Sequence, residues 1–352
     1  MIAAFKVLLP YHFTIPIDAE LSTLIAAAGD LRLEIAAPYQ SFVTDADLST
    51  LSQTSLVELL QKLGRNFAPL VNPSVRIDGR SAIDANVIAM NLRKSHFDRS
   101  VPPKDDPTKM DPSVQTIFNL LNRLIVQIRA ISKSPFVRPL NPESVIWRLD
   151  YLNDDGTELP SQEGMVRGRV VTGFQWRFCS LNEKVWTSLV ELPLERDMPL
   201  WEFLYLDAVN ALPDSGSAIV LAFSAVEVLI SQVLAHHAHL NVKPFGIWEW
   251  LTDRAQYWRE PSITDKVDRI LAVLVGASLK DDQTRWETFR TLKRTRDTFV
   301  HTGEISLDPS AMNSLLMHAK GIIDWLAQYL PAEQQSYAPK YSIQVEITRR
   351  LS

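Results

Sequence analysis

The spacing of apolar residues changes close to Met198, and this change restricts the possible folds more than any other feature. From Met198 to Leu330, apolar residues recur with the period of an α-helix that buries one side. The sequence predicts five helices there, over residues 200–211, 215–239, 264–279, 281–301 and 309–330. We therefore expect an all-helical bundle in this part of the chain.

Residues with special conformational preferences mark the ends of these helices. Asp214 or Ser215 can cap the second helix by accepting a backbone N–H bond. Gly303 lies where a left-handed residue is expected to end the fourth helix. Asp308 followed by Pro309 is a favourable start for the fifth.

The first part of the chain has a mixed character. Residues 31–35 and 75–77 alternate as strands do, and residues 47–63 have the spacing of a helix. Asp78-Gly79 predicts a hairpin turn whose second strand ends near Leu92. The expected fold class of the whole chain is therefore α+β, with a β-rich N-terminal region before the helical bundle.

The middle of the chain joins these two regions. Residues 99–112 contain four prolines and are predicted to be an exposed connector. An amphipathic helix is predicted over residues 113–132, and strands over residues 147–178, with a hairpin turn at residues 154–156. Four parts are expected: a mixed domain over residues 1–110 and, packed on it, a helix plus β segment over residues 111–195. A helical domain follows over residues 196–332, and a tail with a strand over residues 333–352.

Composition and charge exclude several classes of function. The chain has 352 residues and a formal net charge of -5, so it lacks a uniformly basic surface for binding nucleic acid. Any RNA contact must therefore come from a local basic patch. Cys179 is the single cysteine, which excludes an intrachain disulfide and a cysteine-rich zinc site. We expect Cys179 to be a small buried hydrophobic residue.

Neither apolar segment of the chain predicts a membrane anchor. Residues 1–16 contain an early proline and no small-residue cleavage site, so they do not resemble a signal peptide. The longest apolar stretch, residues 218–235, is interrupted by Ser224, Glu227, Ser231 and Gln232. A buried helix in a cytoplasmic protein is the expectation, without a membrane partner.

One short segment carries the residues suited to catalysis. The sequence contains no GxxxxGK[ST], GxGxxG, HExxH or GxSxG motif. Residues 293–303 read KRTRDTFVHTG, in which four residues separate Arg296 from His301 and the polar Asp297 directly follows the arginine. No cofactor is expected, and no metal-ligand set is visible.

This pattern resembles the R-x-x-x-x-H motif of HEPN domains. Upstream, the segments Leu206-Asp207-Ala208, Ala218-x-x-x-Ala222 and Ala225-Val226-Glu227 resemble the first two HEPN helices, so the resemblance covers roughly residues 200–330. It implies a metal-independent ribonuclease with a toxin-like or antiviral role, acting on RNA, for instance tRNA. It also implies a two-fold homodimer through the helical domain and, as in bacterial defence-associated HEPN proteins, a protein partner or trigger at the N-terminal domain.

The position of the motif on its helix supports this interpretation independently. Arg296 falls on the apolar stripe of the fourth helix and must therefore be paired or line a cleft. Its planar fork suits a phosphate. His301 lies about 140° around the helix from Arg296, so the two converge more readily across a dimer than within one chain.

These residues suit RNA cleavage by the RNA's own 2′-hydroxyl, which yields a 2′,3′-cyclic phosphate. His301 would act as general base or acid and Arg296 would stabilise the phosphorane charge, with Asp297 beside it and Glu227 and Asp207 in support. Four basic residues around the motif could hold the strand: Arg285, Arg290, Lys293 and Arg294.

A structural interpretation of the same residues stays open. Arg296 could pair with a buried carboxylate such as Glu227 or Asp207, and His301 could cap the helix end. The chain would then be a non-catalytic HEPN-like module that binds a protein partner or a nucleotide. Two further groups are assigned structural roles. His236, His237 and His239 are expected at a solvated helix end, and Trp248, Trp250 and Trp258 are expected to pack over the core.

Overall fold

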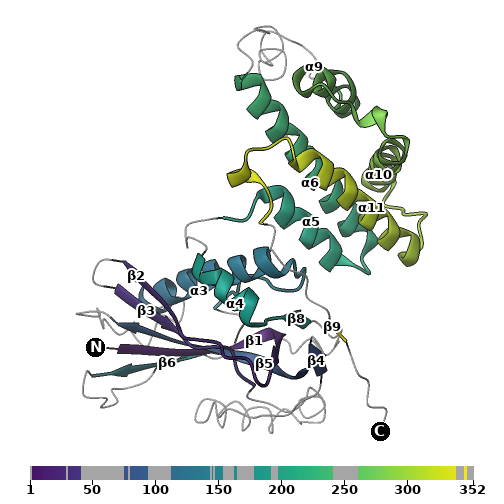
Figure 1. Ribbon diagram of the computed structural model, residues 1–352. Coiled ribbons are helices and arrows are strands. Elements are labelled where there is room, and N and C mark those ends of the chain that lie inside the picture. The colour runs from purple at the N-terminus through teal and green to yellow at the C-terminus, as the bar shows by residue number, and fades with distance from the viewer. Residues whose placement is uncertain are drawn as a thin grey trace, which may run out of the picture. The chain divides into compact units, whose positions relative to one another are not determined.

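The computed structural model divides the chain into two compact units, Met1–Asp197 with Ala338–Ser352, and Met198–Tyr337 (Figure 1). It describes residues 2–28, 31–40, 75–77, 80–93, 112–142, 145, 147–153, 162–164, 178–191, 197–240, 261–337 and 345–346. The fold class is α+β, because in the described residues an antiparallel sheet with helices α3 and α4 precedes a unit built from helices.

The first unit is built on one sheet. Its strands run in the order β2-β3-β5-β1-β6-β7, with β4 pairing β5 and β9, and β8 pairing β1. The bounds are β1 Ile2–Pro16, β2 Leu24–Ala28, β3 Leu31–Ile35, β4 Val75–Ile77, β5 Arg80–Arg93, β6 Trp147–Leu152, β7 Gln162–Gly164, β8 Phe178–Ser180 and β9 Val345–Glu346. The pairings along this path are antiparallel, and β8 lies parallel to β1.

The central strand β1 was not among the predicted strands. Its odd-numbered residues from Ala3 to Ile15 are buried, as expected of a strand with one face on a core. Pairing with β5 shifts register between Leu8 and Phe13, and this irregularity accommodates Pro10, which has no N–H to donate. The proline and the apolar residues on both faces hide the alternation in the sequence.

Two helices cover one face of this sheet, α3 Pro112–Ser132 and α4 Glu183–Glu191 (Figure 1). The predicted amphipathic helix is confirmed, since α3 buries its apolar stripe. Phe118 of α3 meets Phe5 edge-to-face with the ring centroids 5.2 Å apart, and Trp147 of β6 completes the cluster 6.1 Å from Phe118.

Several local predictions for the first unit are confirmed. Strands β3 and β4 occupy the predicted residues, and β4 pairs antiparallel with β5 from Ile77 and Arg80 onward, while Asp78 and Gly79 lie outside the described residues. Strand β5 ends at Arg93, close to the predicted end. The helix expected over residues 47–63, the connector up to residue 111 and the turn at residues 154–156 lie outside the described residues.

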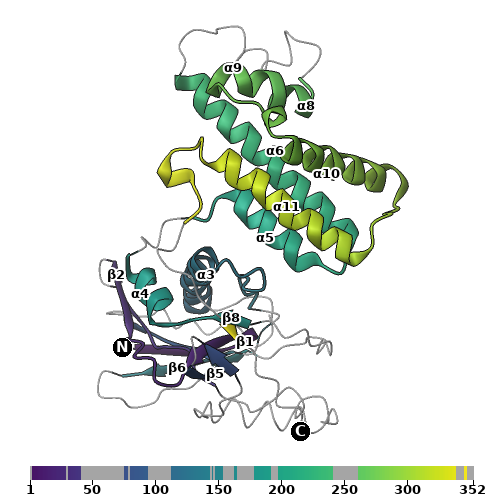
Figure 2. The ribbon, with the colours of Figure 1, turned by 45° about the vertical axis from the view of Figure 1, so that its right-hand side comes forward.

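The second unit contains the predicted bundle. Its helices are α5 Leu200–Ala211, α6 Ser215–Leu240, α8 Ile263–Asp265, the π-helical η1 Lys266–Ile270, α9 Leu271–Val275, the 3-10 turn η2 Leu279–Asp281, α10 Gln283–Thr302, α11 Pro309–Ala327 and the 3-10 turn η3 Ala332–Gln334. Helices α5, α6 and α11 lie side by side, and α10 packs on α6 and α11 (Figure 2).

The predicted helix ends are confirmed where a capping residue specifies them. Asp214 accepts hydrogen bonds from the backbone N–H groups of Gly216 and Ser217 at 3.1 and 3.2 Å. Gly303 ends α10 with a φ of 73°, in the left-handed region that glycine tolerates. Asp308 caps α11 through the N–H of Ala311 at 2.8 Å.

The third predicted helix was wrong at its C-terminal end. It was expected to reach residue 279, but α9 ends at Val275 because Gly276 adopts a φ of 76°. Ser278 then forms a capping box with Asp281, and Asp282 caps α10. An apolar pattern that continued through Leu279 concealed this stop, and the sequence signal for it was the glycine.

Helix α6 forms the centre of the second unit. Among the described residues it alone is long and apolar enough to cross a membrane, with a mean hydropathy of 2.1 over Ser215–Ala238, but more than half of that stretch is buried. Near its start, the Phe299 ring of α10 packs directly on Gly216. A Cβ added at Gly216 would lie 2.3 Å from Cζ of Phe299, so the close approach depends on the glycine.

Candidate functional site

The apolar stripe of α10 positions Arg296. Phe289 and Leu292 are fully buried, and Trp286 stacks on Phe289 with ring centroids 5.8 Å apart. One turn after Leu292, the guanidinium carbon of Arg296 lies 5.0 Å from the centre of the Phe223 ring on α6. The Arg296 side chain remains 33% exposed, so it borders the contact between α6 and α10 and is open to solvent.

Arg296 belongs to a small cluster of charged side chains. Its Nη1 donates a hydrogen bond to Asp297 at 2.9 Å, and Lys293 donates to the other oxygen of the same carboxylate at 2.5 Å. Nη2 of Arg296 lies 3.8 Å from an Oε2 of Glu227, beyond hydrogen-bond distance. One limb of the arginine fork is therefore satisfied and the other faces Glu227 loosely.

The two carboxylates in this cluster differ in acidity. Burial alone would raise the pKa of Asp297, but hydrogen bonds from Lys293 and Arg296 and their charges lower it from its ordinary value. Burial raises the pKa of Glu227, against the opposing charges of Arg296, Lys266 and Lys293. Asp297 is thus locked as an anion, whereas Glu227 is poorly stabilised in its charged form.

His301 is exposed in the last turn of α10, two residues before the Gly303 cap. The neighbours of Arg296 within one chain are Phe223, Glu227 and Asp297. The structure therefore does not join Arg296 to His301 inside a single chain, which agrees with their angular separation on the helix.

The two supporting carboxylates named from the sequence have different positions. Glu227 of α6 lies beside Arg296, whereas Asp207 is half-buried on α5. Of the two carboxylates, Glu227 is therefore the one that lies next to Arg296. The sequence could not decide between them, because both helices carry an acidic residue within an otherwise apolar stretch.

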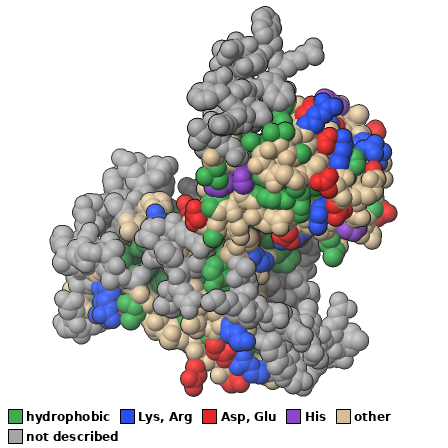
Figure 3. Space-filling view, turned by 45° about the horizontal axis from the view of Figure 1, so that its top comes forward, with side chains coloured by type: hydrophobic (Ala, Val, Ile, Leu, Met, Phe, Trp, Pro, Cys, Tyr) green, Lys and Arg blue, Asp and Glu red, His purple; other side chains and the backbone are tan. Residues whose placement is uncertain are grey.

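The predicted basic patch is partly neutralised. Arg285 pairs with Asp282 at 3.1 Å, Arg290 with Glu287 at 3.0 Å, and Lys293 with Asp297. Arg294 is exposed, and no acidic partner for it occurs among the described residues. Figure 3 accordingly shows basic and acidic side chains intermixed on the helical unit. These ion pairs reduce the net positive charge that an RNA could contact on α10.

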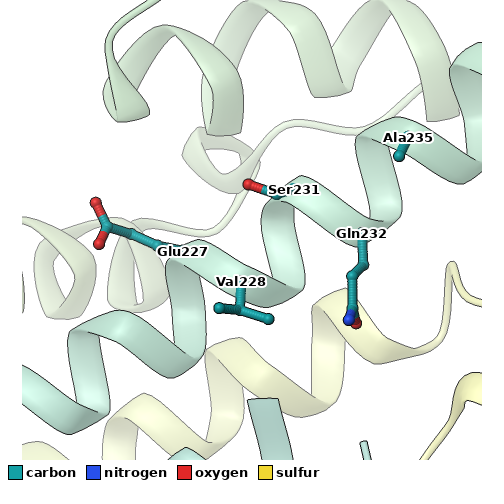
Figure 4. A pocket seen from close by; sticks show the side chains of 5 residues that line it. All are labelled: Glu227, Val228, Ser231, Gln232 and Ala235. Atoms are coloured by element: carbon teal, nitrogen blue, oxygen red, sulfur yellow. The ribbon is translucent and has the colours of Figure 1, made fainter. Parts of the chain in front are cut away.

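Sequence reasoning missed a shallow groove of about 380 Å³ on α6. Glu227, Val228, Ser231, Gln232 and Ala235 line it. Figure 4 shows Glu227 at one end of this row, extending away from the helix axis, with Val228 and Gln232 on another side of the helix. The polar residues that interrupt the apolar stretch were the available signal, because Glu227, Ser231 and Gln232 are all partly or fully exposed on α6.

The other sequence candidates have structural roles or lie outside the described residues. His237 is not simply solvated as predicted, because its Nε2 lies 2.8 Å from the carbonyl oxygen of Tyr329 after α11; His236 packs against it. Cys179 is buried as predicted, and burial raises its pKa to about 11. Among the described residues no metal-binding group of His, Cys, Asp or Glu occurs, and the three tryptophans lie outside them.

Known proteins offer no further guide to the cluster on α10. The chain matches no family model, no curated protein and no solved structure. The likeness to HEPN domains therefore rests on the motif residues and their surroundings alone.

Proposed function

We propose that the chain is a metal-independent RNA endonuclease of the HEPN type, with Arg296 and His301 as its catalytic residues. The observation that supports this most is the state of the Arg296 guanidinium. It lies over the Phe223 ring of α6 with Nη2 not hydrogen-bonded, and Arg296 shares α10 with an exposed His301. A guanidinium in this state can take a phosphate oxygen with its free limb.

The proposed reaction uses the RNA's own nucleophile. The 2′-oxygen attacks the adjacent phosphorus while His301 removes its proton, and the bond from phosphorus to the 5′-oxygen breaks. The leaving 5′-oxygen takes up a proton, which gives a 2′,3′-cyclic phosphate and a 5′-hydroxyl. Arg296 stabilises the added negative charge of the phosphorane, and Asp297 fixes the guanidinium. We propose a defence or toxin role in the cytoplasm, with tRNA among the substrates to test.

Cleavage is expected to persist in EDTA, because the proposed chemistry needs only side chains. Purified protein would be incubated with total RNA with and without EDTA, and the new ends treated with a phosphatase and with a cyclic phosphodiesterase. We expect phosphatase-resistant 3′ ends that the phosphodiesterase opens. Activity lost in EDTA and restored by magnesium or manganese would contradict this reaction class.

The protein is expected to be a homodimer through the helical unit, since Arg296 and His301 of one chain are not neighbours. A two-fold axis could bring both copies of each residue into one cleft. Light scattering at micromolar concentration should give twice the mass of the 39.8 kDa chain. A strict monomer that still cleaves RNA would contradict the composite site.

A second function is favoured by one observation, the contacts that Arg296 already makes. A guanidinium shared between Asp297, Glu227 and Phe223 is also what a structural arginine shows. The chain would then be a non-catalytic module that binds a protein partner or a nucleotide, with the N-terminal unit as a contact surface. Absence of cleavage on every RNA tested, with Arg296→Ala affecting only stability, would support this alternative.

A further inference from the structure

Glu227 has an unusual environment for a carboxylate surrounded by cations. Arg296 and Lys293 of α10 and Lys266 of η1 all lie close enough for their charges to lower its pKa, and Asp297 opposes them. Within the part of the chain that the structure describes, no group donates a hydrogen bond to the Glu227 carboxylate. The carboxylate therefore has charge neighbours but no fixed attachment.

The hydrogen bonds of the cluster go to Asp297 instead. Lys293 and Nη1 of Arg296 both bond to that carboxylate, so Nη2 of Arg296 is the limb left for another anion. Glu227 Oε2 lies 3.8 Å from Nη2, beyond hydrogen-bond distance. A contact of this length between partly exposed groups is weak, and a phosphate oxygen at hydrogen-bond distance would be bound more strongly.

The surroundings of Glu227 give it room to leave. Its side chain is 37% exposed, and the groove on α6 begins beside it and continues past Ser231 to Ala235. Figure 4 shows the Glu227 side chain extending outward at the end of that groove. Rotation about its side-chain bonds can therefore move the carboxylate away from Arg296 without disturbing the core.

We infer that Glu227 is a displaceable internal anion that occupies the phosphate position of Arg296, so that an RNA phosphodiester must exchange with it to bind. This inference rests on the proposed function, because it assigns the anion at Arg296 to RNA. A carboxylate and a phosphodiester each carry one negative charge, and Glu227 stays attached to α6 beside the site after its side chain rotates. Glu227 therefore competes with the phosphodiester for Arg296 and repels it, which weakens RNA binding.

The test measures RNA affinity in the full chain, with a short fluorescein-labelled 2′-O-methyl RNA of mixed sequence. This probe lacks a free 2′-hydroxyl, so the proposed chemistry cannot cut it. Glu227→Gln removes the charge and keeps the shape, and should tighten binding about fivefold or more in low salt. Glu227→Ala, which keeps a good helix former on α6, should give the same gain.

The matched control is Asp324→Asn, which removes one negative charge from an exposed pair with Lys320 on α11. It should change affinity less than about twofold, since its effect is only the long-range one. In an Arg296→Ala background, the gain from Glu227→Gln should disappear. Equal gains for Glu227→Gln and Asp324→Asn, a loss of binding in Glu227→Gln, or a gain that survives without Arg296 would each overturn the inference.

This test separates the inference from the proposed function. Tighter binding in Glu227→Gln that depends on Arg296, in a protein that cleaves no RNA, would support the anion exchange and contradict the nuclease. Cleavage that depends on Arg296 and His301, without any gain in Glu227→Gln, would support the nuclease and overturn the anion exchange.

Discussion

His301→Ala and Arg296→Ala should each lower the rate of RNA cleavage by about 10²- to 10⁴-fold, the range typical of a lost general base or a lost transition-state donor. The reason is that each residue supplies a role that nothing else in the described cluster can replace. Lys293 is committed to Asp297, and His301 is exposed at the end of α10. Initial rates on a fixed RNA substrate under single-turnover conditions measure the effect.

Stability measurements provide the control for both variants. His301 is exposed, so its removal should cost on the order of 1 kcal/mol or less. Arg296 is one-third exposed and its contact with Glu227 is long, so Arg296→Ala should also cost less than about 1 kcal/mol. Arg296→Lys should not restore cleavage well, because a point charge cannot replace the planar fork. Full activity in both alanine variants, or cleavage of a substrate with deoxyribose at the cut site, would exclude the mechanism.

Phe289→Ala should destabilise the helical unit by about 3–5 kcal/mol, the usual cost of removing a fully buried aromatic ring. Phe289 is completely buried, stacks with Trp286 and has its ring centroid 6.2 Å from that of Phe223 on α6. Its removal leaves a cavity between α6 and α10, directly beneath the ring that supports Arg296. Chemical unfolding followed by far-ultraviolet circular dichroism measures the change.

Met317→Ala is the matched control, because Met317 is 68% exposed on α11 of the same unit. Its effect should stay within about 0.5 kcal/mol. The two compact units can unfold in separate transitions, so the comparison uses the transition that carries most of the helical signal. A loss below about 1 kcal/mol for Phe289→Ala would mean that the contact between α6 and α10 is not close-packed at this point.

The sequence predicted those parts of the fold that local chemistry specifies. Caps such as Asp214, Asp308 and Gly303 act through hydrogen bonds and backbone conformations within a few residues, so their effect can be inferred without the tertiary structure. The apolar stripe of α10 was predicted for the same reason. It indicated that Arg296 must be paired or line a cleft, and the structure pairs it with Asp297.

Features that depend on distant residues could not be predicted. The partner of Arg296 was open between Glu227 and Asp207, because the choice depends on how α5 and α6 rotate against α10. The pairing of Arg290 with Glu287 is an exception, because its three-residue spacing on one helix makes it predictable from the sequence. Strand β1 depends on β5 and β6 for its hydrogen bonds, so its pairing cannot be inferred from its own residues.

The contact of Phe299 with Gly216 links the start of α6 to the end of α10 that carries His301. A side chain at position 216 requires the Phe299 ring to move, since a Cβ there would lie 2.3 Å from Cζ of Phe299. These two positions are therefore expected to change together, although 83 positions separate them in the sequence. Relatives with a residue other than glycine at position 216 should carry a smaller side chain at position 299, and the resulting covariation would mark chains that hold His301 in the same way.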